Sequence, residues 1–337
     1  MKRTLRSLLT LTMGVFLALC VTARTARAEV VFKLGTLAPA GSAWHNLLKE
    51  MSQKWKDASG GQVTLRIYPG GVVGNEGDMV RKMRVGQLQA AALTVVGLQE
   101  ITPEPQALSV PMVIESHDEL MYVLQKLGPK LEKSLADKGF AVLQWTEVGV
   151  VRFFSTKPFR TPAEAKGRKI FSWEGDPATV EAWRAASFQP VVLSSTDVVP
   201  ALQTGMIDTI ASAPLYAFTA RLYQKANKMI DLPWSLLVGA LIVKKDAWEQ
   251  VPADIRPKLI EIVKEYGNRI DAEVRRLNDD AVVQMKRQGL EVIAPGDMAA
   301  WRKVADSVNE VVRGKAVPAP IFDEVKKLSA EFRAKGH

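Results

Sequence analysis

The feature that most constrains the fold is a repeated alternation of short apolar strands and amphipathic helices. The first cycle has a strand at 30–34, a helix in which apolar residues recur every three or four positions, and a second strand at 63–68. Ser42 is suited to cap that helix, and the glycines after Ser59 end it. Two strands that flank a helix within about 40 residues pair in parallel. The sequence therefore predicts an α/β fold.

The alternation continues in two runs of similar organisation. The first run adds a helix near 77–85, a strand at 90–95, a helix near 116–127 and a strand at 140–146. A second run of strands and helices begins with a strand at 151–155 and continues to 213. No sequence repeat relates the two runs, so we expect two α/β domains that are alike in architecture only.

The C-terminal part of the chain is predicted to be mainly helical. After a short strand at 240–243, a helical pattern runs from about 255 to 288, followed by shorter helices near 300–312 and 322–332. At about 1.5 Å per residue, the 255–288 helix is long enough to lie across both domains.

Residues 1–28 have the pattern of an export signal. Three basic residues occur within the first six, an uncharged and mostly apolar run follows at 7–23, and small residues stand at Ala26 and Ala28. The run is shorter than the roughly 20 apolar residues that span a bilayer, so an uncleaved anchor is the weaker alternative. We expect export to the periplasm and cleavage before Glu29.

Removal of this segment changes the charge and the cysteine content of the chain. The formal charge falls from +9 to +4, because residues 1–28 contain five basic residues and no acidic one. Cys20, the only cysteine, is removed as well, and Leu19 before it disfavours a lipid anchor there. The remaining charges are mixed and form no basic stripe, so we expect no nucleic-acid partner. Since no second long apolar run occurs, we expect the mature chain not to insert into a membrane.

The sequence shows no pattern typical of a metal, nucleotide or hydrolase site. The three histidines lack other ligands at metal-binding spacing, and the glycines at 70–74 lack the Lys-Ser or Lys-Thr pair of a phosphate loop. We therefore expect no metal, no cofactor and no catalysis. The alternative is an exported enzyme that uses Glu147, Glu174 or Asp176. The carboxylates Glu174 and Asp176 are better suited to cap a helix that starts near Pro177.

Four further stretches occur in the order and spacing of one family. They are Gly60-Gly61-x-Val63, Pro69-Gly70-Gly71-x-x-Gly74, Gly86 leading into Ala90-Ala91, and Leu202-Gln203-x-Gly205-x-Ile207-Asp208. With the export signal, they make the mature chain resemble the substrate-binding proteins of tripartite ATP-independent periplasmic (TRAP) transporters, DctP type.

This resemblance implies a periplasmic clamshell whose two α/β lobes close over one small molecule and deliver it to a TRAP-type membrane permease, without chemistry. The long helix would span both lobes. The first lobe would comprise 29–149 and 238–275, and the second 150–237 and 276–337. Hinges are expected near Gly149 and near 237–239, and closure would bring the lobes together around the ligand.

The resemblance also implies a departure in the ligand site. Most members bind organic acids through an arginine in the strand after a Lys-Gly-x-Lys-Ile type motif, which matches 166–170 here, and Phe171 occupies the arginine position. A second family arginine matches Arg152. A phenyl ring forms none of the charge-assisted bonds that a guanidinium gives a carboxylate. We expect a ligand less acidic, or more apolar and aromatic, than usual; the alternative is a monocarboxylate held by Arg152 alone.

The other candidate ligand contacts are aromatic residues or lie where strands end and helices begin in an open α/β sheet. They are Trp44, Glu76, Thr94, Trp145, Trp173, Ser212, Pro214 and Trp234.

Overall fold

The computed structural model describes residues 29–174 and 176–335, so the predicted export signal lies outside the described residues. One mixed sheet of nine described strands runs through the molecule in the order β2-β1-β3-β8-β4-β7-β5-β6, with β9 paired to β8. The strands are β1 (Val30–Thr36), β2 (Val63–Tyr68), β3 (Ala90–Thr94), β4 (Phe140–Ser155), β5 (Lys169–Trp173), β6 (Gln189–Leu193), β7 (Thr209–Ser212), β8 (Lys228–Lys244) and β9 (Glu291–Ile293). The α/β class is confirmed.

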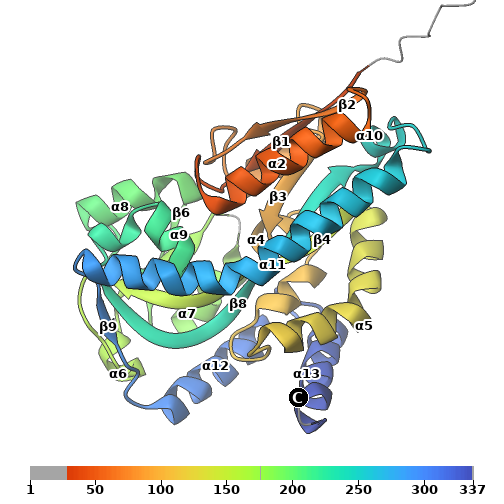
Figure 1. The fold of residues 1–337 in the computed structure, drawn as a ribbon. Coiled ribbons are helices and arrows are strands. Elements are labelled where there is room, and N and C mark those ends of the chain that lie inside the picture. The colour runs from red at the N-terminus through yellow and green to blue at the C-terminus, as the bar shows by residue number, and fades with distance from the viewer. Residues whose placement is uncertain (1–28, 175, 336–337) are drawn as a thin grey trace, which may run out of the picture.

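Twelve α-helices cover this sheet (Figure 1), counted among the described residues. They are α2 (Ala43–Ala58), α3 (Glu76–Arg84), α4 (Val95–Leu98), α5 (His117–Ala136), α6 (Pro162–Ala165), α7 (Pro177–Ala185), α8 (Val198–Thr204), α9 (Pro214–Thr219), α10 (Lys245–Glu249), α11 (Arg256–Arg287), α12 (Met298–Val312) and α13 (Ala319–Ala334).

The first cycle of the chain folds as predicted. The Ser42 side chain accepts a hydrogen bond from the backbone N–H of His45 and so caps α2. One face of α2 is buried, with Met51 and Trp55 in a core that also contains Phe32 of β1. β1 pairs in parallel with both β2 and β3. The carboxyl ends of these strands therefore meet at one edge, beside the start of α2.

Two long strands lie in the middle of the sheet and join its two halves. β4 and β8 are antiparallel partners from Phe140 opposite Lys244 to Ser155 opposite Lys228, with three register shifts. The predicted extents of these strands were therefore wrong. The sequence predicted two separate strands at 140–146 and 151–155, where β4 is continuous, and a single short strand at 240–243, where β8 is long. The register shifts interrupt the apolar alternation of β4. In β8, the exposed residues Asp231 and Pro233 interrupt the apolar pattern before residue 236.

The long helix α11 confirms the prediction for 255–288. It has 32 residues and runs along both halves of the molecule (Figure 1), with contacts to α2, β4 and α9. Its buried Asn278 side chain accepts from the backbone N–H of Leu215 and donates to the carbonyl of Val148. Polar side chains of α11 thus fix it to β4 and α9.

The C-terminal helices pack on different parts of the molecule. α12 packs against α7, and α13 packs against α5. The predicted lobe boundaries place α5 in the first lobe and α13 in the second. The contact between α5 and α13 therefore joins segments assigned to different lobes. The lobe boundaries at 149–150, 237–238 and 275–276 stay a prediction.

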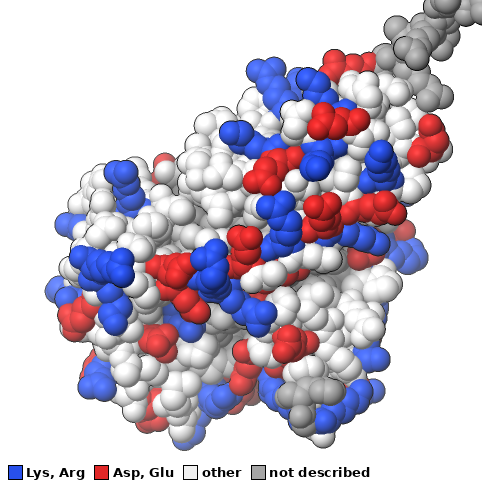
Figure 2. Space-filling model, in the orientation of Figure 1, with Lys and Arg blue, Asp and Glu red and all other residues white. Residues whose placement is uncertain are grey.

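The surface around α2 and α11 carries charges of both signs. Figure 2 shows Lys and Arg side chains interspersed with Asp and Glu over this face. Within the described part of the chain, no helix is both long and apolar enough to cross a bilayer.

Candidate functional site

A cavity of about 180 Å³ lies between the two halves of the sheet, β2-β1-β3 and β7-β5-β6. One side is formed by the carboxyl ends of β1 and β3 with α2, and the other by β5, β7 and the start of α8. The long strands β4 and β8 and the middle of α11 close it from behind. This is the position at which open α/β sheets bind ligands.

The walls of the cavity are mainly apolar and aromatic. Trp44 enters from α2, while Phe171 and Trp173 enter from β5. The rings of Phe171 and Trp173 are 5.2 Å apart between centroids in an edge-to-face arrangement, and Phe171 is 5% exposed. Among the described residues that line the cavity there is no Lys, Arg or His. An apolar ligand surface matches such walls.

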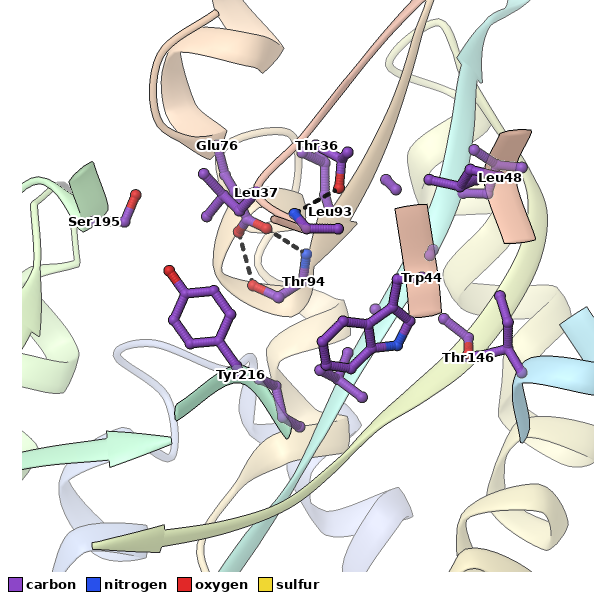
Figure 3. Close-up of a pocket in the computed structure, with 18 of the residues that line it drawn as sticks. Thr36, Leu37, Trp44, Leu48, Glu76, Leu93, Thr94, Thr146, Ser195 and Tyr216 are labelled. Carbon is purple, nitrogen blue, oxygen red and sulfur yellow. Dashed lines mark hydrogen bonds between the residues drawn. The ribbon is translucent and has the colours of Figure 1, made fainter. Parts of the chain in front are cut away.

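Glu76 is the one acidic residue among the described residues of the lining, and it is 3% exposed. Its two carboxylate oxygens accept hydrogen bonds from the Thr94 N–H and the Thr94 hydroxyl, each at 2.7 Å (Figure 3). A third bond comes from the Gly97 N–H. A Cβ on Gly97 would lie 2.7 Å from the Glu76 Cβ, so this close approach to α4 requires glycine. Burial raises the Glu76 pKa, against the opposing effect of the three hydrogen bonds.

Two hydroxyl groups lie near this carboxyl. In Figure 3 the Tyr216 ring lies below Glu76 with its hydroxyl directed toward the side of Ser195, and burial, followed by the charge of Glu76, raises the pKa of Tyr216. Ser195 begins a 3₁₀ turn (Ser195–Asp197) and is 8% exposed. Its Oγ is buried and has no hydrogen-bond partner among the described residues. Glu76, Thr94, Tyr216 and Ser195 thus form a polar end in an otherwise apolar cavity.

A narrow recess adjoins the polar end. Glu76, Trp173 and Ser195 line both the recess and the cavity. The recess adds the carboxylates of Glu100 and Glu174, and again the described residues that line it include no Lys, Arg or His. The charged side chains that line the cavity or the recess are therefore all acidic among the described residues.

Six of the predicted ligand contacts are brought together at this cavity. They are Trp44, Glu76, Thr94, Phe171, Trp173 and Ser212. Their contact with a ligand remains a proposal.

The other four predicted contacts lie away from the cavity lining. The Arg152 Nε donates to the Asp231 carboxylate at 2.7 Å, so this arginine is in an ion pair between β4 and β8. Trp145 donates its indole N–H to Glu132 at 3.0 Å. Trp234 packs in an aromatic cluster with Phe153, Trp183 and Trp301, and Pro214 is the first residue of α9.

Sequence reasoning missed several residues of the cavity. Tyr216 lies in the first turn of α9, just after β7, and Ser195 follows β6. Ser212 and Pro214 were selected because they lie at the carboxyl end of a strand. The same rule could have found Tyr216 and Ser195. Tyr266 and Ile270 come from the middle of α11, where no sequence signal distinguishes a cavity residue from a core residue.

The carboxylates considered for an enzyme have separate surroundings. Glu147 is buried and 2.8 Å from the His117 Nδ1, and Asp176 caps α7 by accepting from the Thr179 N–H at 3.0 Å. Only Glu174 borders the recess. The predicted capping role of Asp176 is confirmed, and the three carboxylates do not form one site.

The raised pKa of Glu76 predicts how stability depends on pH. Above about 4.5, the unfolded chain releases a proton that the folded protein retains, so this group's contribution falls as the pH rises through the folded-state pKa. We expect the free energy of unfolding of the natural protein, relative to Glu76→Gln, to decrease from about pH 4.5 upward. Urea denaturation at several pH values measures it. A difference that does not change with pH would contradict the burial argument.

Comparisons with known proteins agree on one family. Residues 34–313 match the family described as bacterial extracellular solute-binding protein, family 7 (DctP). A C4-dicarboxylate-binding periplasmic protein DctP of Rhodobacter capsulatus is 23% identical, over 84% of this chain and 85% of its own length. The 2,3-diketo-L-gulonate-binding periplasmic protein YiaO of Escherichia coli K12 is 24% identical, over 80% and 81%.

Solved structures show the same two-lobed fold. A TRAP periplasmic solute-binding protein from Desulfovibrio salexigens, with bound orotic acid, has a TM-score of 0.83 and 20% identity and covers 91% of this chain and 99% of its own. Another from Xanthobacter autotrophicus, with bound β-D-galacturonate, has a TM-score of 0.82 and 17% identity over 89% and 99%. This chain therefore belongs to the bacterial extracellular solute-binding protein family 7, the DctP-type binding proteins of TRAP transporters.

Proposed function

We propose that this protein is exported, cleaved before Glu29, and captures one small molecule in the cavity between its lobes for delivery to a TRAP-type permease. Trp44, Phe171 and Trp173 form the apolar wall of that site, and Glu76, Thr94 and Ser212 supply polar groups. Export is supported by the pattern of residues 1–28. The permease is supported by membership of the family.

The ligand is less acidic, or more apolar and aromatic, than the organic acids named for the relatives. The observation that carries this proposal is the lack of Lys, Arg and His among the described residues of the lining, together with the buried carboxyl of Glu76. A bound carboxylate would find no cation there, and the charged form of Glu76 would repel it. Leaving a buried charge without a partner costs about 3–5 kcal/mol.

Arg152 does not change this expectation. Its Nε is paired with Asp231, and it lies outside the cavity lining. Binding of a monocarboxylate through Arg152 would require its side chain to move into the cavity lining.

The volume limits the ligand to about one ring with small substituents. Apolar cavities of about 150 Å³ in other proteins hold a benzene molecule, and this one has about 180 Å³. The edge-to-face pair of Phe171 and Trp173 offers the geometry that aromatic rings prefer in contact.

A thermal-shift experiment on the chain from Glu29 onward tests the proposal. Ring compounds without a carboxylate are expected to raise the melting temperature by a few degrees at about a hundredfold excess over Kd, because a ligand that binds only the folded state stabilises it. Matched carboxylic acids should have no such effect, and a bound compound should be recovered unchanged. Stabilisation by the acids alone would refute the proposed ligand class, and turnover of a bound compound would favour the enzyme alternative.

A further inference from the structure

We propose that the ligand is an organic cation, a primary amine on an apolar or aromatic body, whose ammonium group binds at Glu76. This inference rests on the proposed function, since it specifies the ligand of the same cavity. It follows from charge, from unpaired hydrogen-bonding groups and from the aromatic rings at the polar end.

The charge argument starts from the isolation of Glu76. Its carboxyl is 3% exposed and receives hydrogen bonds from Thr94 and Gly97, yet no cationic side chain lines the described part of the cavity. A buried carboxylate without a counter-ion is unfavourable, and an opposite charge close by relieves that cost. A cation carried by the ligand would complete the missing half of the ion pair.

The hydrogen-bonding groups match an ammonium ion. Such a group has three N–H donors and no acceptor, as the lysine side chain does. Three acceptor groups lie at the polar end: the carboxylate of Glu76, the hydroxyl of Tyr216 and the Oγ of Ser195 (Figure 3). The Ser195 Oγ is buried without a partner among the described residues. A buried polar atom that lacks a hydrogen bond is costly, and a donor on the ligand would satisfy it.

Aromatic rings line the same cavity as the polar end. Trp44, Trp173 and Tyr216 all line the cavity, and Trp173 also lines the adjoining recess. The face of an aromatic ring attracts a cation, most strongly for tryptophan and in sites with little water. The same rings pack against the apolar body of the ligand.

The recess gives the cation a second source of attraction. Glu100 and Glu174 lie there beside Glu76, without a basic residue among the described lining. Arg81, on the next turn of α3, is paired with Asp78. Acidic groups in a narrow recess raise the local concentration of cations and disfavour anions.

The experiment compares four probes built on one ring: benzylamine, benzyl alcohol, toluene and benzoate. Isothermal titration calorimetry at pH 7.5 measures their affinities for the mature chain. Benzylamine is expected to bind at least tenfold more tightly than benzyl alcohol, which has the same shape without the charge. If benzyl alcohol or toluene binds as tightly as benzylamine, the inference is overturned while the proposed apolar ligand class stands. If benzoate binds most tightly, the proposed ligand class itself fails.

The variant Glu76→Gln tests the assigned residue while preserving its shape. We expect at least a thirtyfold loss in benzylamine affinity, since truncating one partner of a buried charged pair weakens binding strongly. Toluene affinity should change by less than threefold, which shows that the cavity is intact. An equal loss for both probes would mean that Glu76 only maintains the structure, and would overturn its assignment.

A second variant, Ser195→Ala, keeps the test decisive if Glu76→Gln does not fold. It removes one acceptor, so a threefold to tenfold loss is expected for benzylamine and none for toluene. Unchanged benzylamine affinity in this variant would exclude the proposed three-acceptor site. If none of the four probes binds the natural protein, the ring-sized ammonium ligand is likewise excluded.

Discussion

Replacing Phe171 by arginine is expected to raise the affinity for small organic acids at least tenfold. Phe171 occupies the position that the family resemblance gives to a ligand-binding arginine, and it lines the cavity in the structure. A guanidinium there would supply the bidentate, charge-assisted hydrogen bonds that the natural lining lacks. Calorimetry with benzoate and succinate, on Phe171→Arg and on the natural protein, measures the gain.

The same change should lower the stability of the unliganded protein. Phe171 is 5% exposed and packs on Trp173, so the substitution buries a charge and removes an aromatic contact. The expected loss is about 2–4 kcal/mol, in part restored by a bound acid. Phe171→Leu is the matched control, which should lose stability without gaining affinity for acids.

Glu76 could pair with the new guanidinium and hide it from the ligand. The double variant Phe171→Arg with Glu76→Gln separates the two effects, because it leaves the guanidinium free for an acid. If neither the single nor the double variant binds any tested acid more tightly than the natural protein does, Phe171 does not occupy the ligand-binding position.

The variant Gly239→Ala is expected to lose about 3 kcal/mol of stability. Gly239 lies in β8 between Thr94 of β3 and Thr146 of β4, beside the cavity. A Cβ there would be 2.7 Å from the carbonyl oxygen of Leu93. That atom belongs to the backbone of the neighbouring strand and cannot rotate away, so strand pairing has to shift. Urea denaturation measures the loss.

The matched control is Gly128→Ala in α5. The nearest atom to a Cβ at Gly128 is 3.9 Å away, which is an ordinary contact. Alanine inside a helix is favoured over glycine by about 1 kcal/mol, but Pro129 follows and disfavours helical backbone in a preceding residue that has a Cβ. The two effects oppose each other, so this variant should change stability by less than about 1 kcal/mol. If Gly239→Ala loses less than about 1 kcal/mol, the close packing of β3 on β8 is looser than the structure indicates.

The class of fold and the order of its elements could be predicted from the sequence, because local signals determine them. Ser42 caps α2 as expected, and the 255–288 pattern forms α11. The family resemblance carried the prediction of two lobes. The continuous β8 could not be predicted, because Asp231 and Pro233 lie in its exposed part and resemble a loop.

The candidate site was predicted best where strand ends determine it. Thr94 and Ser212 end β3 and β7 and do line the cavity, and so does Glu76 at the start of α3. The aromatic contacts were harder to predict, because nothing in the sequence distinguishes Trp145 and Trp234 from Trp44 and Trp173. Only the packing of distant elements decides which indole faces a cavity and which enters a core.

Three elements connect the two halves of the molecule, and this has a mechanical consequence: they are β4, β8 and α11. β4 and β8 are hydrogen-bonded to each other along their length, and α11 lies against β4 and contacts α2 and α9 on either side. Such a connection resists shear and torsion, since either would break paired strands, but it bends elastically out of its plane. We therefore expect any opening of the cavity to be shared by many small dihedral changes along β4, β8 and α11, and not confined to the hinges expected near Gly149 and 237–239.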